Sequence, residues 1–260
     1  MQEHEYATMY EAEDRHWWYV GLRTVMFKLL DLPRHPSGKA LRQMRILDAG
    51  CGTGGTLNRL RGYPRAVGFD YSPIALSFCH QRELNNVRLG SIGAIPFPDR
   101  EFDLVVSLDV ICDAGTPSEN VILAELYRVL KPGGRLYLNL PAYAWLRGEH
   151  DLAAGVVRRY TAEGLAAMLN AAGFEVARMT YWNTLLFPLV LAVRLSSRWG
   201  MSTDPNAARS DVKVPFAPLN RILTNIVRLE AAWLRGHDLP FGSSLACIAV
   251  KPSTSSPRTQ

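Results

Sequence analysis

The chain has 260 residues, of which 48% are hydrophobic and 20% charged, a balance typical of a globular protein with one substantial core. The net charge is +5, but the 24 Arg and 5 Lys, 29 in all, are scattered along the chain. Nucleic-acid-binding proteins usually gather such charge in one segment or on one face, so we expect no nucleic acid partner. The four cysteines lie far apart without a CxxC pair, which argues against a disulfide framework and against a zinc or other metal site.

The start of the chain and its longest apolar stretch indicate the compartment. The N-terminus is acidic and aromatic, whereas a secretory signal is basic and then apolar, so we expect a cytoplasmic protein. The stretch Met179–Val193 is uncharged, but it is short for a transmembrane span and contains Pro188. Residues 253–260 are mostly polar and predict a disordered tail.

The first 38 residues predict a helical segment that precedes the core. Between Glu3 and Asp31 large apolar residues recur at helical spacing, which predicts one or two amphipathic helices. The run Leu32–Lys39 contains two prolines and a glycine and predicts a linker. We therefore assign residues 1–38 to an N-terminal helical lid.

From Arg45 onward short apolar runs alternate with helical patterns, which is typical of βαβ crossovers and of a parallel sheet covered on both faces. The expected strands are Arg45–Asp48, Ala66–Asp70, Val87–Leu89, Phe102–Leu108, Gly134–Leu140, Glu175–Tyr181 and Ser244–Val250. The expected helices are Thr53–Leu60, Pro73–Leu84, Glu119–Leu130 and Thr161–Ala172. The alternation predicts an α/β fold of the Rossmann-like, doubly wound type over residues 39–181 and 241–252.

Residues 182–240 predict a helical insertion before the last strand. We expect an apolar helix, a polar loop around Gly200–Ser210 and an amphipathic helix Leu219–Arg235. An apolar insertion beside the strand ends predicts a cap over the pocket of a substrate. Three alternatives stay open: the two helices only pack together, they form the face of a homodimer, or they make a peripheral contact with a membrane.

The run Ile46–Gly55 leads from a buried strand directly into a glycine-rich turn and a helix. Glycines are needed there because any Cβ would keep a ligand away from the backbone amides at the strand end. Asp48 stands two residues before the first glycine, where a carboxylate suits a cationic amino acid group better than a pyrophosphate. Asp70, 70 − 48 = 22 residues later, ends the next strand and can accept both hydroxyls of a ribose. The alternatives are a purely structural turn and a dinucleotide site.

Five runs together resemble the class I S-adenosylmethionine-dependent methyltransferases, in particular their type-11 group. They read Leu-Asp-Ala-Gly-Cys-Gly-Thr-Gly at 47–54, Gly-Phe-Asp-Tyr-Ser-Pro at 68–73, Ile-Pro-Phe-Pro-Asp at 95–99, Phe-Asp-Leu-Val-Val-Ser at 102–107 and Arg-Val-Leu-Lys-Pro-Gly-Gly at 128–134. The resemblance implies a seven-stranded sheet whose last strand is antiparallel. It also implies that S-adenosylmethionine lies across the carboxyl ends of the strands.

The resemblance further implies which residues hold the cofactor. The implied set is Trp18, Arg23, Asp48, Gly50, Cys51, Gly52, Asp70, Tyr71, Ser91, Ile92 and Leu108. In this set Asp70 holds the ribose, Tyr71 flanks the adenine and Leu108 touches the methionine end. Ser91-Ile92 departs from the family, which often has Asp-Ala there, so the hydrogen bond to the adenine amine is expected to be weaker or to come from the backbone. A second departure is Cys112-Asp113, where many relatives have Glu-His.

The run Glu13–Arg23 resembles the lead segment of one type-11 subgroup, which implies that it folds over the cofactor. Arg23 would then lie near the methionine carboxylate, and the aromatic side chains would shield the sulfonium. The alternative is that Trp17 and Trp18 only anchor this helix to the core.

His150, His16 and Tyr160 are the candidates for catalysis. His16 belongs to the lead segment, and the other two belong to a second run, His150–Thr161, that resembles the same subgroup. A histidine suits a general base because its unperturbed pKa lies near neutral pH. A loop histidine is more often a surface or structural residue, and this alternative stays open for His150.

These patterns predict an enzyme that transfers a methyl group from S-adenosylmethionine to a small-molecule acceptor by in-line displacement, without a metal. The apolar insertion favours an apolar or aromatic acceptor from specialised metabolism, methylated on oxygen, nitrogen or carbon. The alternatives are a membrane-associated lipid or quinone-like acceptor, a non-catalytic cofactor-binding protein, and a nicotinamide-dependent oxidoreductase.

Overall fold

The computed structural model describes residues 3–113, 115–148, 151, 155–197 and 214–253, which build an α/β fold around one seven-stranded sheet. The strands are β1 (Ile46–Ala49), β2 (Ala66–Asp70), β3 (Val87–Leu89), β4 (Phe102–Leu108), β5 (Leu130–Pro141), β6 (Glu175–Trp182) and β7 (Ser244–Val250). Their order across the sheet is β3-β2-β1-β4-β5-β7-β6. β1 to β5 pair in parallel and β7 is antiparallel to both of its neighbours, which confirms the expected sheet.

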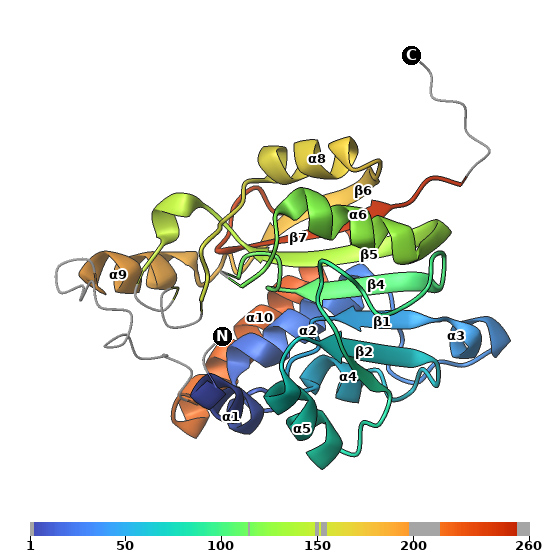
Figure 1. Cartoon of the computed structure of the whole chain (residues 1–260). Coiled ribbons are helices and arrows are strands. Elements are labelled where there is room, and N and C mark those ends of the chain that lie inside the picture. Colours follow the sequence, from blue (N-terminus) through green and yellow to red (C-terminus); the bar gives the residue numbers. More distant parts are fainter. Residues whose placement is uncertain (1–2, 114, 149–150, 152–154, 198–213, 254–260) are drawn as a thin grey trace.

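The order of the strands determines where a ligand can bind. β1 pairs with β2 on one side and with β4 on the other, so the connections leave the centre of the sheet in opposite directions. In such sheets a crevice opens outside the carboxyl ends of the strands at the point where the order reverses. This edge is on the left in Figure 1, beside the N-terminal helix and α9 (Phe187–Ser197).

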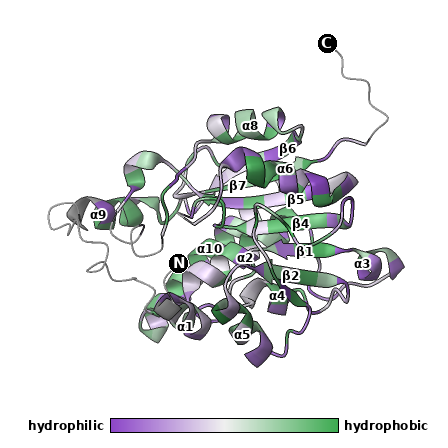
Figure 2. Ribbon diagram, in the orientation of Figure 1, coloured by the Kyte–Doolittle hydropathy of each residue, from purple (hydrophilic) through white to green (hydrophobic). Residues whose placement is uncertain are grey.

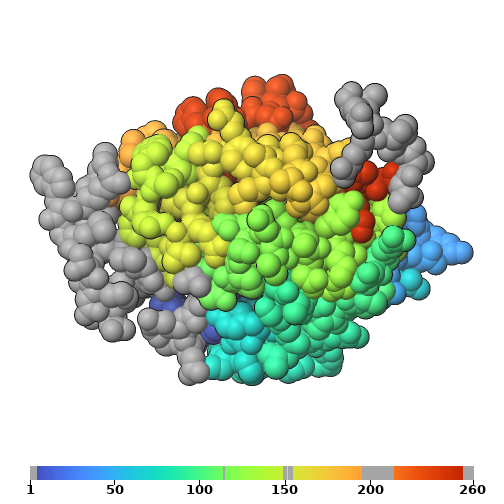
Figure 3. Space-filling model, turned by 45° about the horizontal axis from the view of Figure 1, so that its top comes forward, coloured from blue at the N-terminus to red at the C-terminus, as the bar shows by residue number. Residues whose placement is uncertain are grey.

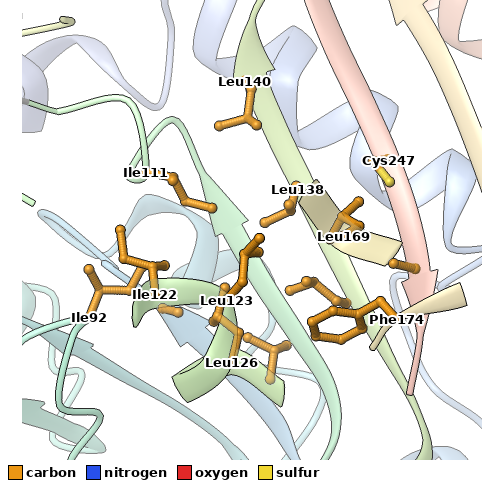
Figure 4. Close-up of a cluster of buried hydrophobic side chains, with 14 of the residues drawn as sticks. Ile92, Ile111, Ile122, Leu123, Leu126, Leu138, Leu140, Leu169, Phe174 and Cys247 are labelled. Atoms are coloured by element: carbon orange, nitrogen blue, oxygen red, sulfur yellow. The ribbon is translucent and has the colours of Figure 1, made fainter. Parts of the chain in front are cut away.

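Helices cover both faces of the sheet, as a parallel sheet requires. One face packs against α6 (Glu119–Val129) and α8 (Ala162–Ala171), which contribute side chains to the buried cluster in Figure 4. The outer surfaces of the two helices adjoin in Figure 3. The other face packs against α2 (Trp17–Leu29), α4 (Gly55–Arg59), α5 (Pro73–Gln81) and α10 (Ala217–Trp233).

The N-terminal segment forms two helices, α1 (Glu3–Ala12) and α2, and the second belongs to the core. Val25 and Met26 of α2 have no exposed surface, and fully burying side chains of this size stabilises a fold by roughly 1.5–3 kcal/mol each. The helix α10 of the insertion lies against α2, and a Cβ at Gly21 would be 2.7 Å from Val227 Cγ1. The segments expected to be lid and cap therefore pack on each other, and the division into domains stays a prediction.

Several element boundaries differ from those expected. α4 and α5 are shorter than the predicted Thr53–Leu60 and Pro73–Leu84, and α3 (Lys39–Gln43) is a short additional helix. β5 begins at Leu130, not at Gly134, because Leu130 pairs with Phe102. The register then shifts: Arg135 pairs with Leu104, and the Lys-Pro-Gly-Gly run of β5 lies between the two pairs. A short 3-10 helix (Ala144–Leu146) follows β5. The predicted loop Gly200–Ser210 and residues 254–260 of the tail lie outside the described residues.

Candidate active site

A cavity of about 510 Å³ opens at the carboxyl edge of the sheet, a size typical of small-molecule sites. Its wall comes from α1 and α2, the glycine turn after β1, the loop after β4, the segment that precedes α8, α9 and the start of β7. Of the residues predicted from the sequence, the wall contains His16, Trp18, Arg23, Asp48, Gly50, Cys51 and Leu108. The crevice expected from the strand order is therefore present.

The glycine turn brings backbone to the cavity because two of its residues adopt left-handed conformations. The φ angles are 82° at Gly50 and 53° at Gly52, where residues with a Cβ are strained. A Cβ at Gly50 would also lie 2.5 Å from the side chain of Val110. The amides of Gly50 and Cys51 both donate to the carbonyl of Phe69, so the turn is held against the end of β2.

Asp48 and Arg23 each place on this wall one polar atom that no hydrogen bond of the described residues satisfies. Asp48 is 2% exposed, and burial raises the pKa of its carboxyl to about 7, with Glu13 and Asp70 adding to the effect. Among the described residues, Asp48 Oδ2 and Arg23 Nε have no hydrogen-bond partner. An unpaired carboxylate oxygen and an unpaired guanidinium N–H complement the ammonium and carboxylate of an amino acid. The residues present therefore fit the methionine portion of S-adenosylmethionine.

Glu13 is an important buried residue that was not predicted as part of the site. It is 2% exposed, accepts a hydrogen bond from Thr53 Oγ1, and accepts another from Arg82 Nη2 at 2.9 Å. Its other oxygen lies 3.7 Å from Arg23 Nη1. Glu13 thus joins the N-terminal helices to the glycine turn and holds Arg23 in the wall. The acidic start of the Glu13–Arg23 run was the signal in the sequence that could have pointed to Glu13. Its partners Thr53 and Arg82 could not be inferred, because they are distant in sequence.

The predicted adenosine-binding residues lie outside the cavity wall. Asp70 is oriented at the end of β2, where Oδ2 accepts from the Gly52 amide at 2.9 Å and Oδ1 from the Ser72 amide at 3.0 Å. Helix α1 covers this edge: a Cβ at Gly52 would lie 2.9 Å from Met9 Cε, and Tyr6 interacts with Tyr71 and Asp70.

Beyond this edge, Tyr71 and Ser91 are exposed and Ile92 is buried in the core. The cavity wall thus contains residues predicted to hold the methionine portion of the cofactor, but not Asp70, Tyr71, Ser91 or Ile92, which were predicted to hold its adenosine.

The aromatic lead segment both anchors α2 and lines the cavity. Trp18 stacks on Trp182 with ring centroids 4.9 Å apart, and the Trp17 amide donates to Asn220 of α10 at 2.9 Å. His16 caps α2, since its Nδ1 accepts from the Trp18 amide at 3.3 Å. A segment that covers the cofactor and a segment that anchors α2 to the core are therefore compatible alternatives.

The second predicted run contributes residues other than those expected. His150 lies outside the described residues. Tyr160 is buried away from the cavity wall, with its hydroxyl 3.4 Å from Glu119 Oε1. The neighbouring Arg159 does line the cavity and forms two hydrogen bonds with buried Asp151, at 2.7 and 3.1 Å. Tyr160 is therefore not part of the described cavity wall, and its catalytic role stays a prediction, whereas Arg159 and Asp151 shape the wall.

The comparisons with known proteins agree with this geometry. Residues 47–138 match the family described as "Methyltransferase domain". The chain is 32% identical to the demethylmenaquinone methyltransferase of Tropheryma whipplei over 175 residues, which cover 56% of this chain and 71% of that protein. It is 30% identical to the 24-methylenesterol C-methyltransferase 2 of Arabidopsis thaliana over 158 residues, 52% of this chain and 42% of that protein. The chain belongs to the class I S-adenosylmethionine-dependent methyltransferases.

The fold of this methyltransferase is similar to that of solved structures along nearly its whole length. A Haloferax volcanii protein solved in complex with the Trm112 methyltransferase activator gives a TM-score of 0.60 at 20% identity, covering 98% of this chain and 96% of that one. The first curated relatives match over about half of their own length, between 42% and 52%.

Family membership sets aside the nicotinamide-dependent oxidoreductase as a function for this methyltransferase. In the described part of the chain no cluster of three or more His, Cys, Asp or Glu could hold a metal. No described helix combines the length and apolar character that crossing a membrane needs.

Proposed function

We propose that this methyltransferase acts on a small apolar or aromatic acceptor bound at the α9 end of the cavity. The observation that carries the proposal is the lining of that end, where aliphatic side chains converge from the 3-10 helix, from α9 and from the residue just before α9. They are Leu146, Leu186, Leu189, Val190 and Val193. Such a lining favours apolar ligands, with a few polar groups fixing their orientation.

The other end of the cavity is the proposed place of the cofactor, which supplies a methyl group on a positively charged sulfur when bound. Asp48 would bind its ammonium, Arg23 its carboxylate, and the turn at Gly50 and Cys51 would follow its chain. Trp18 and Leu108 would exclude water from the reacting atoms. Orientation and desolvation can contribute on the order of 7 kcal/mol or more to such a transfer.

A lipid or quinone-like acceptor is the second candidate, supported by the rim of the cavity. Here we call Leu185, Leu189 and Val193 the α9 rim; they are 60%, 54% and 52% exposed, and the α9 sequence is largely hydrophobic (Figure 2). Beside it, a row of aromatic rings links Trp145 to Phe187 and Phe187 to Phe241, with centroids 6.1 and 5.5 Å apart. Exposed apolar patches with tryptophan are typical of membrane-contacting surfaces. The names of the sterol and demethylmenaquinone relatives favour the same class of acceptor.

Transfer of labelled methyl from S-adenosylmethionine to four probes tests both candidates. The probes are catechol, a geranylated hydroquinone, cycloartenol and phosphoethanolamine. We expect labelling of catechol or of the two isoprenoid probes and none of phosphoethanolamine, because an aliphatic wall does not compensate the desolvation of a phosphate. Labelling of phosphoethanolamine alone would contradict an apolar acceptor, and labelling of catechol alone would contradict the lipid candidate.

A further inference from the structure

Asp109 follows the last residue of β4 and carries an unusual backbone conformation at the cavity wall. Its φ is 57°, a left-handed value that aspartate adopts only at an energetic cost. The strained residue is held in place because its amide donates to the Asn139 carbonyl at 2.9 Å. Its side chain lines the same cavity as Asp48 and Leu108. Strain retained at a cavity wall is a sign of function.

Two buried side chains fix the orientation of the Asp109 carboxylate. Asn139 Nδ2 donates to Asp109 Oδ1 at 3.0 Å, and Asn139 Oδ1 accepts from Trp182 Nε1 at 2.7 Å. Asn139 and Trp182 have no exposed surface, and Trp182 is stacked beneath Trp18 of the cavity wall. The indole can only donate, so it fixes which end of the Asn139 amide faces Asp109. The carboxylate is therefore an oriented hydrogen-bond acceptor.

We propose that Asp109 is the catalytic base that takes the proton of the methyl acceptor, and that Asn139 and Trp182 are its positioning residues. The acceptor's X–H bond breaks, with its proton passing to a carboxylate oxygen of Asp109 and its electron pair forming the new X–CH₃ bond. The bond between methyl and sulfur breaks with its electron pair staying on sulfur, which becomes a neutral thioether. Atoms and charge balance without a further reactant. The step applies to an acceptor whose oxygen, nitrogen or activated carbon carries the proton that is lost. For an alkene such as cycloartenol the π electron pair forms the new bond to methyl, and Asp109 would take the proton that the resulting cation loses.

The charges around Asp109 suit this role. Burial raises the pKa of its carboxyl to about 7, while the hydrogen bond from Asn139 and the charge of Arg159 act in the opposite direction. The other titratable groups that face it are Tyr19 from α2, Tyr137 from β5, and Cys112 and Asp113 from the loop after β4. Burial raises the pKa of Tyr19, Tyr137 and Cys112, so these groups are neutral near pH 7. A base whose pKa lies near the working pH combines availability with driving force.

The test uses Asp109→Asn in the full chain. Asparagine tolerates a left-handed φ and keeps an oxygen for the Asn139 hydrogen bond, so the variant removes only the ionisable group. Asp31→Asn is the matched control: Asp31 also has a left-handed φ, of 51°, but its side chain is 86% exposed and pairs with Arg235 at the surface.

The first measurements need no acceptor. Carbon-13 titration of carboxyl-labelled aspartates should show two carboxyls that titrate near pH 7 in wild type, those of Asp48 and Asp109, and the one that is missing in Asp109→Asn is the Asp109 carboxyl. In Asn139→Ala this carboxyl should titrate at higher pH, because the hydrogen bond that favours its ionised form is lost. Calorimetry should show that Asp109→Asn changes the affinities for S-adenosylmethionine and S-adenosylhomocysteine by less than about threefold.

Two results of these acceptor-free measurements would overturn the proposal. One is an Asp109 carboxyl that titrates below about pH 5, since it would be too weak a base for this role. The other is a loss of about tenfold or more in affinity for S-adenosylmethionine alone, which would assign Asp109 to the sulfonium charge. With whichever probe is labelled in the four-probe assay as the acceptor, kcat of Asp109→Asn should be lower than that of wild type by about 100-fold or more, while KM stays within about threefold. An Asp109→Asn enzyme as active as Asp31→Asn would also contradict the base.

Discussion

Single residues decide the chemistry of this methyltransferase through what surrounds them. Asp48, Asp109 and Glu13 are acids that the fold buries or partly buries, and burial raises the pKa of each. A carboxyl whose pKa is raised on folding stabilises the fold most below its unfolded pKa, near 4, and this contribution is lost as the pH rises through its folded pKa. The site is therefore built at the expense of stability at neutral pH.

Asp48→Asn should separate these two effects. For wild type, the free energy of unfolding should decrease between about pH 4 and pH 7, because the pKa of Asp48 is about 7 in the folded chain. In Asp48→Asn this decrease should be smaller by roughly 2–4 kcal/mol. The same variant should weaken binding of S-adenosylmethionine, whose cation favours the ionised carboxylate. Urea unfolding across pH and calorimetry at pH 7 measure the two effects.

The control is Asp238→Asn, which removes a surface carboxylate that pairs with Arg178. It should leave both the pH dependence and the cofactor affinity near wild type. If the free energy of unfolding of Asp48→Asn depends on pH as that of wild type does, the Asp48 carboxyl of the folded wild type is already ionised at low pH, which would contradict a raised pKa.

At the scale of elements, the contact between α2 and α10 joins the N-terminal segment to the insertion. Gly21 permits it, since a Cβ there would lie 2.7 Å from Val227 Cγ1. The buried Leu223 and Val227 of α10 pack in the same cluster as Val25 and Met26 of α2. Residues separated by about 200 positions thus build one layer, which also carries Trp18 and Arg23 to the cavity.

Gly21→Leu should destabilise the protein by about 1–3 kcal/mol, because extra side-chain volume forces the two helices apart. Val227→Ala should recover part of this loss in the double variant, which thermal unfolding can measure as a coupling energy. Gly236→Leu is the control, since a Cβ at Gly236 meets no atom within 4 Å. Equal losses in Gly21→Leu and Gly236→Leu would contradict the packing argument.

At the scale of the whole molecule, exposed apolar side chains lie both near the cavity entrance and on the edge strand β3. The α9 rim lies beside the cavity, whereas β3 is at the edge of the sheet. The chain also carries a net charge of +5, which favours anionic surfaces. A lipid or quinone-like acceptor would require this entrance to meet a membrane surface.

Leu185→Glu should weaken association with vesicles of phosphatidylcholine and phosphatidylglycerol by about tenfold, because a carboxylate is repelled by the anionic surface and resists burial among acyl chains. Its affinity for S-adenosylhomocysteine should not change, since Leu185 is outside the cavity wall. Leu89→Glu on β3, where the side chain is 57% exposed, is the matched control and should bind vesicles like wild type. Co-sedimentation measures both. Absence of wild-type binding at low salt would contradict the membrane surface and leave the small soluble acceptor.

Local patterns in the amino-acid sequence were enough to predict the class of fold, the order of strands and helices from Arg45 to the end of β6, and the glycine turn with its two flanking acids. These features are recorded in short-range patterns: hydrophobic periodicity, turn residues and motifs within a few tens of residues. Asp48, Gly50 and Leu108 were therefore predictable as members of one site.

Which polar groups meet and which are buried became known from the three-dimensional packing. Glu13 bonds with Thr53 across 40 positions, and Asp109, Asn139 and Trp182 form their chain across separations of 30 and 43. It also showed that Tyr160 is directed away from the cavity while its neighbour Arg159 lines it. Burial and partner choice depend on packing between distant elements, and no local pattern encodes them.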